Sequence, residues 1–130
     1  MYLKQFDEWH PVKKRLQSEE RHVYIRPGEI RWIAFGVNLG SEIDGKGVSF
    51  TRPGFVVHVF GSFLALVIPL STKMKDHPGY LPFEWDGKPT AICIHQMRVV
   101  SQKRIFSRKG RISETRLLSV KRSIKDFFSL

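Results

Sequence analysis

The only cysteine of the chain, Cys93, stands two residues before His95. Both fall in an apolar segment that predicts a β-strand, where residues two apart point to the same face of the sheet. A thiol beside an imidazole could form a nucleophile with its base, or two ligands of a metal ion. The sequence has no second ligand motif such as HxxxH or CxxC, and its five histidines are scattered. We therefore expect no metal centre and no cofactor, and interpret Cys93 as a packed, unreactive thiol.

A second chemical pattern, from Gly40 to Gly47, nearly matches the phosphate-binding loop GxxxxGK[ST]. That loop requires a hydroxyl residue after the lysine and a helix whose N-terminus receives the phosphates. Gly47 stands where the hydroxyl residue is needed, and Arg52-Pro53-Gly54 soon follows, a sequence unfavourable to a helix. These departures argue against nucleotide hydrolysis.

The positive charge is concentrated near the C-terminus. Residues 98–125 contain ten Lys and Arg residues but one acidic residue, Glu114, so this segment accounts for nearly all of the net charge of +10. We interpret it as a phosphate-facing surface or a dock for an acidic partner. The alternative is a solvated face that keeps the protein soluble. Few aromatic residues lie nearby, so the sequence does not establish a stacking platform for single strands.

The length and composition bound the architecture that must position these residues. The chain has 130 residues, 42% of them hydrophobic, which is enough for one domain with a real core. A single cysteine excludes an internal disulfide framework and fits a reduced, cytoplasmic location. The N-terminus has no apolar stretch typical of a signal peptide, and the longest apolar run, residues 60–70, is shorter than the about 20 residues that span a bilayer. We expect no membrane contact.

Hydrophobic periodicity and turn residues predict a helix at each end and strands between. The first helix covers residues 2–19, and Pro11 should kink it or begin a second helix. The last helix begins at Ser113, a favourable N-cap. In the strand at residues 29–35, Ile30, Trp32 and Ala34 should share one face. Further segments are predicted as a long loop at 36–51, strands at 55–60, 63–70 (ended by Pro69), 80–85, 90–94 and 98–100, and a helical turn at 103–109. Five or six mostly antiparallel strands with terminal helices predict an α+β fold, mainly β, around a small closed or half-open barrel.

Six short motifs, in this order and spacing, resemble the PemK/MazF toxins of bacterial toxin–antitoxin pairs. The resemblance covers about residues 26–128, which predicts a helical extension at residues 1–25 followed by a toxin domain at 26–130. The matching segments are Pro27-Gly28-Glu29-Ile30-Arg31-Trp32, Gly40-Ser41-Glu42, Arg52-Pro53, Pro69-Leu70-Ser71-Thr72, Gln96-Met97-Arg98-Val99-Val100 and Lys103-Arg104-Ile105.

This resemblance implies an SH3-like antiparallel barrel of the PemK, MazF and CcdB kind. It also implies a homodimer with an RNA groove across its interface and a cognate antitoxin that covers the groove. The implied activity is metal-independent, sequence-specific cleavage of single-stranded RNA, in which the 2′-OH attacks the adjacent phosphate. The alternative is a catalytically weak barrel that only binds RNA, a topoisomerase or an antitoxin.

The resemblance also assigns roles to residues. Arg52 would stabilise charge on the phosphorane, Ser71 or Thr72 would hydrogen-bond the phosphate, and Glu42 or His95 would act as the base. Family members often carry an acid before the glutamine, and some have an arginine two residues before that acid; here those positions are His95 and Cys93. The residues expected to bind RNA are Lys46, Lys73, Gln96, Arg98, Lys103 and Arg104.

Overall fold

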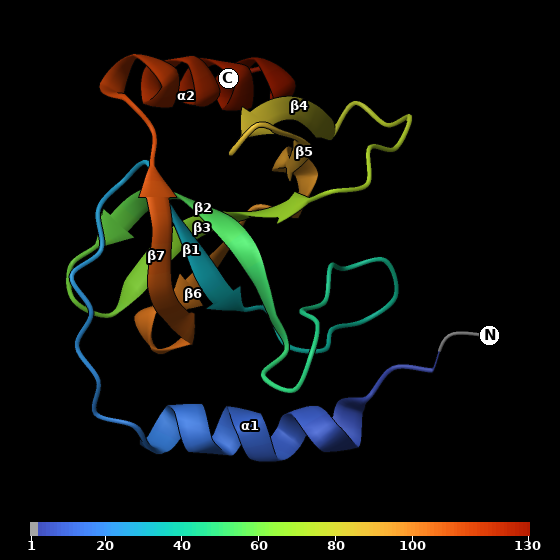
Figure 1. Ribbon diagram of the computed structural model, residues 1–130, viewed down its shortest axis with the longest axis vertical. Helices are drawn as coiled ribbons and strands as arrows, with labels where there is room; N and C mark the ends of the chain where they lie inside the picture. Colours follow the sequence, from blue (N-terminus) through green and yellow to red (C-terminus); the bar gives the residue numbers. More distant parts are fainter. Residues whose placement is uncertain (1–2) are drawn as a thin grey trace.

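Seven strands form one curved antiparallel sheet, and a helix lies at each of its two ends (Figure 1). The computed structural model describes residues 3–130, so the predicted helical position Tyr2 lies outside the described residues. The two helices are α1 (Phe6–Ser18) and α2 (Glu114–Phe127). The strands are β1 (Glu29–Ala34), β2 (Thr51–Phe60), β3 (Leu64–Ser71), β4 (Tyr80–Trp85), β5 (Lys88–Cys93), β6 (Arg98–Ser101) and β7 (Ile105–Arg111). Two short 3₁₀ helices, η1 (Ile94–Gln96) and η2 (Gln102–Arg104), flank β6.

Strand β3 is the central strand of the sheet and pairs with three other strands. One edge pairs with β2 along most of its length, while the other pairs with β6 in its first half and with β5 at Leu70 and Ser71. This division gives the order β4-β5-β3-β2-β1-β7 with β6 as a branch. Among residues 3–130 no hydrogen-bonded pairing joins β4 to β7, so the barrel is open. Trp85 of β4 nevertheless packs directly on Gly110 of β7, where a Cβ would lie 2.2 Å from the indole.

The predicted α+β class, mainly antiparallel with a helix at each end, is therefore confirmed, with three local corrections. The helical turn expected at residues 103–109 is wrong, because only Gln102–Arg104 is helical and β7 follows it. A strand forms there because the outer edge of β1 is available for pairing, a tertiary opportunity that local propensity does not encode. Pro69 does not end β3, which continues to Ser71 by pairing with β5. Strand β2 begins at Thr51 and includes Pro53, earlier than the predicted residue 55.

Helix α1 forms as a single helix that includes Pro11, so no second helix begins there. Its apolar side chains Trp9 and Leu16 are buried against Ala34, Val37 and Phe50. Helix α2 begins at its predicted cap, where the Ser113 hydroxyl accepts the N–H of Arg116 at 3.2 Å. The buried face of α2, Leu117 and Val120, covers the largest core cluster, around Ile30, Phe55 and Ile92. Each helix thus covers one end of the barrel.

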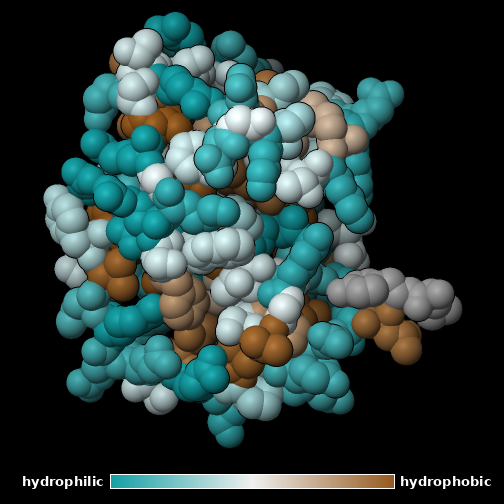
Figure 2. Space-filling view, in the orientation of Figure 1, coloured by the Kyte–Doolittle hydropathy of each residue, from teal (hydrophilic) through white to brown (hydrophobic). Residues whose placement is uncertain are grey.

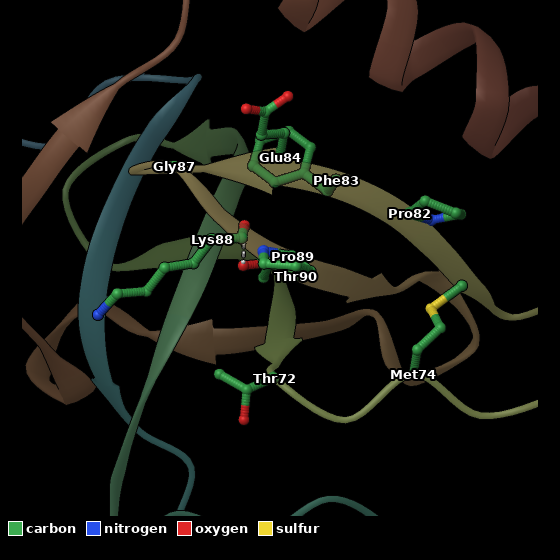
Figure 3. A pocket seen from close by; sticks show the side chains of 9 residues that line it. All are labelled: Thr72, Met74, Pro82, Phe83, Glu84, Gly87, Lys88, Pro89 and Thr90. Carbon is green, nitrogen blue, oxygen red and sulfur yellow. Dashed lines mark hydrogen bonds between the residues drawn. The ribbon is translucent and has the colours of Figure 1, made fainter.

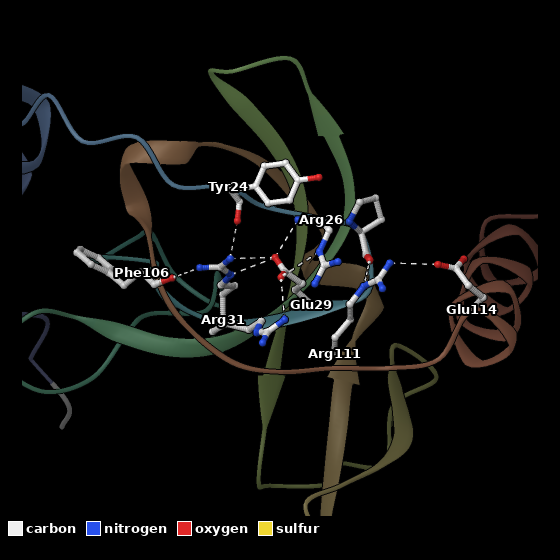
Figure 4. Close-up of polar contacts among 9 residues, drawn as sticks. Tyr24, Arg26, Glu29, Arg31, Phe106, Arg111 and Glu114 are labelled. Carbon is white, nitrogen blue, oxygen red and sulfur yellow. Dashed lines mark hydrogen bonds and ion pairs between the residues drawn. The ribbon is translucent and has the colours of Figure 1, made fainter.

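Glu29 is the centre of a buried polar cluster that fixes the segment between α1 and β1 (Figure 4). Its carboxylate accepts two N–H groups of Arg31, at 3.0 and 3.2 Å, and the main-chain N–H of Arg26 at 2.8 Å. Arg31 in turn donates to the carbonyl oxygens of Tyr24 at 2.7 Å and of Phe106 at 2.9 Å. One ion pair therefore ties the incoming segment, β1 and β7 together, and gives two residues of the first sequence motif a structural role.

Candidate functional site

A groove of about 480 Å³ opens where the start of β2 meets the end of β3. Strands β1 and β7 and the β4–β5 turn form its walls, and we call it the central groove. Three residues predicted to be catalytic, Arg52, Ser71 and Thr72, line it together with the predicted RNA-binding residue Lys46. The sheet brings them together because β2 and β3 are antiparallel neighbours, with Gly54 opposite Pro69.

Arg52 is held from two directions by main-chain carbonyl groups. Its Nε donates to the carbonyl oxygen of Asp44 at 2.9 Å, and its Nη1 donates to that of Leu70 at 3.3 Å. Burial lowers the pKa of the guanidinium, while Cys93, Tyr80 and Asp44 act in the opposite direction. An arginine remains protonated under such shifts. Arg52 is therefore a fixed positive charge at the edge of the groove, with part of its donor fork not used by these two bonds.

Ser71 and Thr72 lie at the edge of the groove because β3 continues beyond Pro69 and ends at Ser71. Ser71 pairs with Ala91 of β5, and its hydroxyl accepts the N–H of Lys73 at 3.1 Å. Thr72 lies at the boundary with a second hollow of about 370 Å³ along the β4–β5 hairpin, which Met74 and Pro82 also line (Figure 3). The two hollows share Thr72, so the groove continues along the hairpin. Lys73 lies on the exposed loop beside them and lines neither.

The groove also contains aromatic and cationic side chains that were not among the predicted site residues: Trp32, Trp85, Lys88 and, from the basic segment, Lys109. The ammonium of Lys109 lies 4.6 Å from the centre of the Trp32 ring, and Trp32 is 36% exposed. Ile30 and Ala34, which were predicted to share one strand face with Trp32, are fully buried. Strand β1 pairs regularly with β2 from Ile30 to Ala34, and the register shifts on either side of Arg31 place the extra residues in β7. The turn residues Asp86 and Gly87 predict a hairpin, and this hairpin places Trp85 and Lys88 at its tip, where both line the groove.

A separate hollow of about 440 Å³ holds the two residues predicted as candidate bases, Glu42 and His95. Glu42 accepts the N–H of Leu39 at 2.8 Å. Gln96, predicted to bind RNA, accepts the N–H of Ile43 at 3.1 Å and donates to the carbonyl of Ser41 at 3.0 Å. These bonds fix the loop between β1 and β2. The predicted site is thus divided between two hollows, with Arg98 in this second one.

Cys93 and His95 do not share a strand face as predicted, because Cys93 ends β5 and His95 lies in η1. The change to a 3₁₀ turn breaks the two-residue alternation. The His95 ring packs on His77 and Tyr80, with ring centres 4.6 and 5.2 Å away, and its Nδ1 is buried without a hydrogen-bond partner in the described part of the chain. Cys93 is fully buried, and burial raises its pKa to about 11. The thiol therefore stays protonated, as an inert packed cysteine should.

Residues 3–130 contain no group of three or more His, Cys, Asp or Glu side chains that could hold a metal ion. No helix among them is long and apolar enough to cross a membrane.

A family model described as the PemK-like, MazF-like toxin of type II toxin–antitoxin systems matches residues 26–128. The chain belongs to this family. Helix α1 lies outside the matched residues. The resemblance drawn from the six motifs is confirmed.

Solved structures share the fold of this PemK-like chain. MazF (form I) from Deinococcus radiodurans has a TM-score of 0.62 and 16% identity, over 83% of this chain and 100% of that one. Toxin MazF-mt6 from Mycobacterium tuberculosis has a TM-score of 0.58 and 12% identity, over 81% and 98%. An endoribonuclease in complex with its cognate antitoxin, from a mycobacterial species, has a TM-score of 0.59 and 10% identity, over 82% and 97%. A comparison with curated protein sequences found no match.

Several basic residues of the C-terminal segment of this PemK-like chain donate to main-chain carbonyl groups. Lys103 donates to the carbonyl of Gln17 at 2.6 Å, and Arg104 donates to that of Ala34 at 3.0 Å, so these two predicted RNA-binding residues engage α1 and β1. Arg116 donates to the carbonyl of Glu84 at 2.9 Å. Of the ten basic residues, Lys109 alone lines the central groove.

Proposed function

We propose that this toxin-family chain is an endoribonuclease that cuts single-stranded RNA through attack of a 2′-OH on the adjacent phosphate. The observation that carries the proposal is the placement of Arg52, held by two carbonyls in a groove beside the hydroxyls of Ser71 and Thr72. A half-buried guanidinium whose Nη2 makes no hydrogen bond within the described residues suits a phosphate whose charge grows during the reaction.

In the proposed reaction, the 2′-oxygen forms a bond to phosphorus and the bond to the 5′-oxygen breaks. The products are a 2′,3′-cyclic phosphate and a 5′-hydroxyl end. Arg52 would neutralise the equatorial oxygens of the phosphorane, and the Ser71 or Thr72 hydroxyl would orient the phosphate by a hydrogen bond. The nucleophile belongs to the substrate and Arg52 supplies the charge stabilisation, so we propose a metal-independent reaction.

The remaining features of the groove suit a single strand. Trp32 and Trp85 offer aromatic rings for base stacking, while Lys46, Lys88 and Lys109 offer positive charge for phosphates. The adjoining hollow at Thr72 extends the groove along the hairpin and could receive a further nucleotide. Such contacts to bases would give the cleavage its sequence preference.

We propose the family's partners for this chain as well: a second copy in a homodimer and a cognate antitoxin. A solved relative of the same fold is an endoribonuclease in complex with its cognate antitoxin. An acidic antitoxin segment would compete with RNA for the lysines of the groove and switch the activity off. We propose the cytoplasm, where RNA and antitoxin are both present, as the site of action.

For the base, we favour His95 over Glu42, because the Glu42 carboxylate already accepts the Leu39 N–H and an imidazole ring can both accept and donate a proton. One observation favours the alternative of a protein that binds RNA without cutting it. Neither Glu42 nor His95 lines the groove that contains Arg52.

A pair of matched RNA substrates distinguishes these functions. Purified protein is incubated in excess EDTA with an RNA that it cuts and with the same RNA carrying one 2′-deoxy nucleotide at the cut site. We expect cleavage of the first to a cyclic phosphate and no cleavage of the second at that position. Cutting of the deoxy substrate would contradict the mechanism. Tight RNA binding without any cleavage would establish the binding function instead.

A further inference from the structure

The loop at residues 35–50 joins β1 to β2 beside α1 (Figure 1). It packs on α1 through Val37 and Phe50, and its Asp44 carbonyl accepts a hydrogen bond from the proposed catalytic Arg52. Helix α1 lies outside the family match, which begins at residue 26. The helix and the residues just before it contact the loop in two places, and both contacts bear on the position of Arg52 in the central groove.

The first contact is the indole of Trp9, which lies against the backbone at the base of the loop. A Cβ on Gly36 would come within 2.4 Å of the Trp9 ring, and Gly36 has a φ of +77°. Only glycine combines that backbone angle with so close an approach. The ring also meets Phe50 edge-on, with ring centres 5.7 Å apart. Gly36 and Phe50 are joined by a hydrogen bond of 3.1 Å, so Trp9 packs on the base of the loop where its two ends meet.

The second contact is Lys4, just before α1 begins. Its ammonium donates to the carbonyl of Asn38 and lies 3.4 Å from the Asp44 carboxylate. That carboxylate also accepts the N–H of Asn38 at 2.7 Å. Lys4 is mostly buried in this position. It therefore joins the two sides of the loop at the level of Asp44.

The loop passes this constraint to the groove through the main chain of Asp44. The carbonyl oxygen of Asp44 accepts the Nε–H of Arg52 at 2.9 Å. A shift of the loop by about an ångström would break this bond or rotate the guanidinium away from the phosphate position. Misplacements of that size can cost about 100-fold in rate.

We propose that α1 with Lys4 is a positioning element for Arg52, in which Trp9 and Lys4 hold the loop so that the Asp44 carbonyl orients the guanidinium. Trp9 and Lys4 touch no substrate in this arrangement and act through the loop. The inference rests on the proposed catalytic role of Arg52. It adds to that proposal a reason why this chain carries a helix before its toxin-family region.

The test uses the full chain and two readouts, one of which does not depend on RNA cleavage. The first is the ¹⁵N NMR signal of the Arg52 Nε–H group, assigned by its loss in Arg52→Lys. The second is the single-turnover rate on a short RNA, with binding measured separately on the 2′-deoxy analogue. The variants are Trp9→Ala, Trp9→Phe and Lys4→Ala. The matched control is Lys14→Ala, which removes the same charge from an exposed position of α1.

We expect the Arg52 signal to shift and to exchange faster with water in Lys4→Ala and Trp9→Ala, and to stay as in the wild type in Lys14→Ala. The rate should fall about 3- to 10-fold in Lys4→Ala and about 10- to 100-fold in Trp9→Ala, with binding changed less than about threefold. Trp9→Phe should recover part of the loss. If Trp9→Ala fails to fold, Lys4→Ala carries the test, because its removal leaves no cavity in the core.

The outcomes separate the two proposals. If the wild type cuts RNA and neither the signal nor the rate responds to Lys4→Ala or Trp9→Ala, the positioning role is overturned and the nuclease proposal stands. If the wild type cuts no RNA but the signal responds, the positioning role stands and the nuclease proposal fails. Equal losses in Lys14→Ala and Lys4→Ala would show a general effect of charge and overturn the inference.

Discussion

At the scale of single residues, the two bonds that fix Arg52 make it more than a surface arginine. We predict that Arg52→Ala lowers the RNA cleavage rate about 100- to 1000-fold, the usual cost of losing one preorganised donor to a developing negative charge. The same change leaves the Asp44 and Leu70 carbonyls without this donor, so the free energy of unfolding should fall by about 1–3 kcal/mol. Cleavage assays and urea unfolding measure the two effects.

Two variants keep this test clear of folding defects. Arg52→Lys retains the charge but cannot donate from Nε and Nη1 together, so it should fold well and still lose much of the rate. Arg122→Ala removes an exposed arginine of α2 and should change neither quantity. A folded Arg52→Ala protein within tenfold of the wild-type rate would remove Arg52 from the mechanism.

Cys93 gives a pH-dependent prediction of stability. Burial raises its pKa from 9.0 to about 11, so between those values the folded protein keeps the thiol proton that the unfolded chain loses. The free energy of unfolding should therefore decrease as pH rises from about 9 to 11, with a contribution from Cys93 of at most about 1.4 kcal/mol per pH unit.

Urea unfolding of the wild type and of Cys93→Ala at several pH values isolates this contribution, since lysines and tyrosines titrate equally in both. The wild-type curve should fall more steeply above pH 9. Parallel curves for the two proteins would mean that the thiol ionises as readily in the folded state as in the unfolded state.

At the scale of elements, the buried pair of Glu29 and Arg31 holds the segment before β1 to β7. We predict that Glu29→Ala lowers the free energy of unfolding by about 3–5 kcal/mol, because it leaves the buried Arg31 guanidinium uncompensated. The exposed pair of Glu114 and Arg111 is the matched control. Glu114 is 74% exposed, so Glu114→Ala should cost less than about 1 kcal/mol.

Urea unfolding of both variants measures the difference. A similar, small cost for both would show that the incoming segment is held by packing rather than by this ion pair.

At the scale of the whole molecule, the net charge of +10 comes from basic residues spread over the fold. Several of them, such as Lys4, Lys103 and Arg104, bind carbonyl or carboxylate oxygens of the protein itself. The face in Figure 2 is mostly hydrophilic, with hydrophobic side chains in small separate groups. We therefore expect the lysines that bind RNA to be those that line the central groove, and not simply those in the most basic segment of the sequence. Strong salt dependence of RNA binding is expected wherever lysines neutralise phosphates, because each contact releases counterions.

We predict that Lys46→Ala, Lys88→Ala and Lys109→Ala together reduce the slope of log affinity against log salt by about 2, at about 0.7 per contact on a single strand. The control replaces Lys121, Arg122 and Lys125 of α2, which removes the same charge away from the groove. Binding of a 2′-deoxy RNA at several salt concentrations measures both slopes. A larger change in the α2 variant would place the RNA surface on that helix.

The sequence by itself determined most of the elements and the family. The Ser113 cap and the spacing of Leu117 and Val120 located α2, and the Asp86-Gly87 turn located the β4–β5 hairpin, because each signal lies within a few neighbouring residues. The short motifs placed the chain among the PemK-like toxins. They also singled out Arg52, Ser71 and Thr72, which antiparallel pairing then brings into one groove.

Only the tertiary structure decided the rest. Strand β7 exists because β1 offers an edge, and its Lys109 lies over the ring of Trp32 in the central groove. Gln96 holds a loop and Arg104 a strand end through bonds to carbonyls more than 50 residues away in the sequence. Such bonds depend on which backbone segments become neighbours after folding. Residue type and spacing identify a side chain that can bind a phosphate. Only the fold determines whether the donor groups of that side chain already form hydrogen bonds with main-chain carbonyl oxygens.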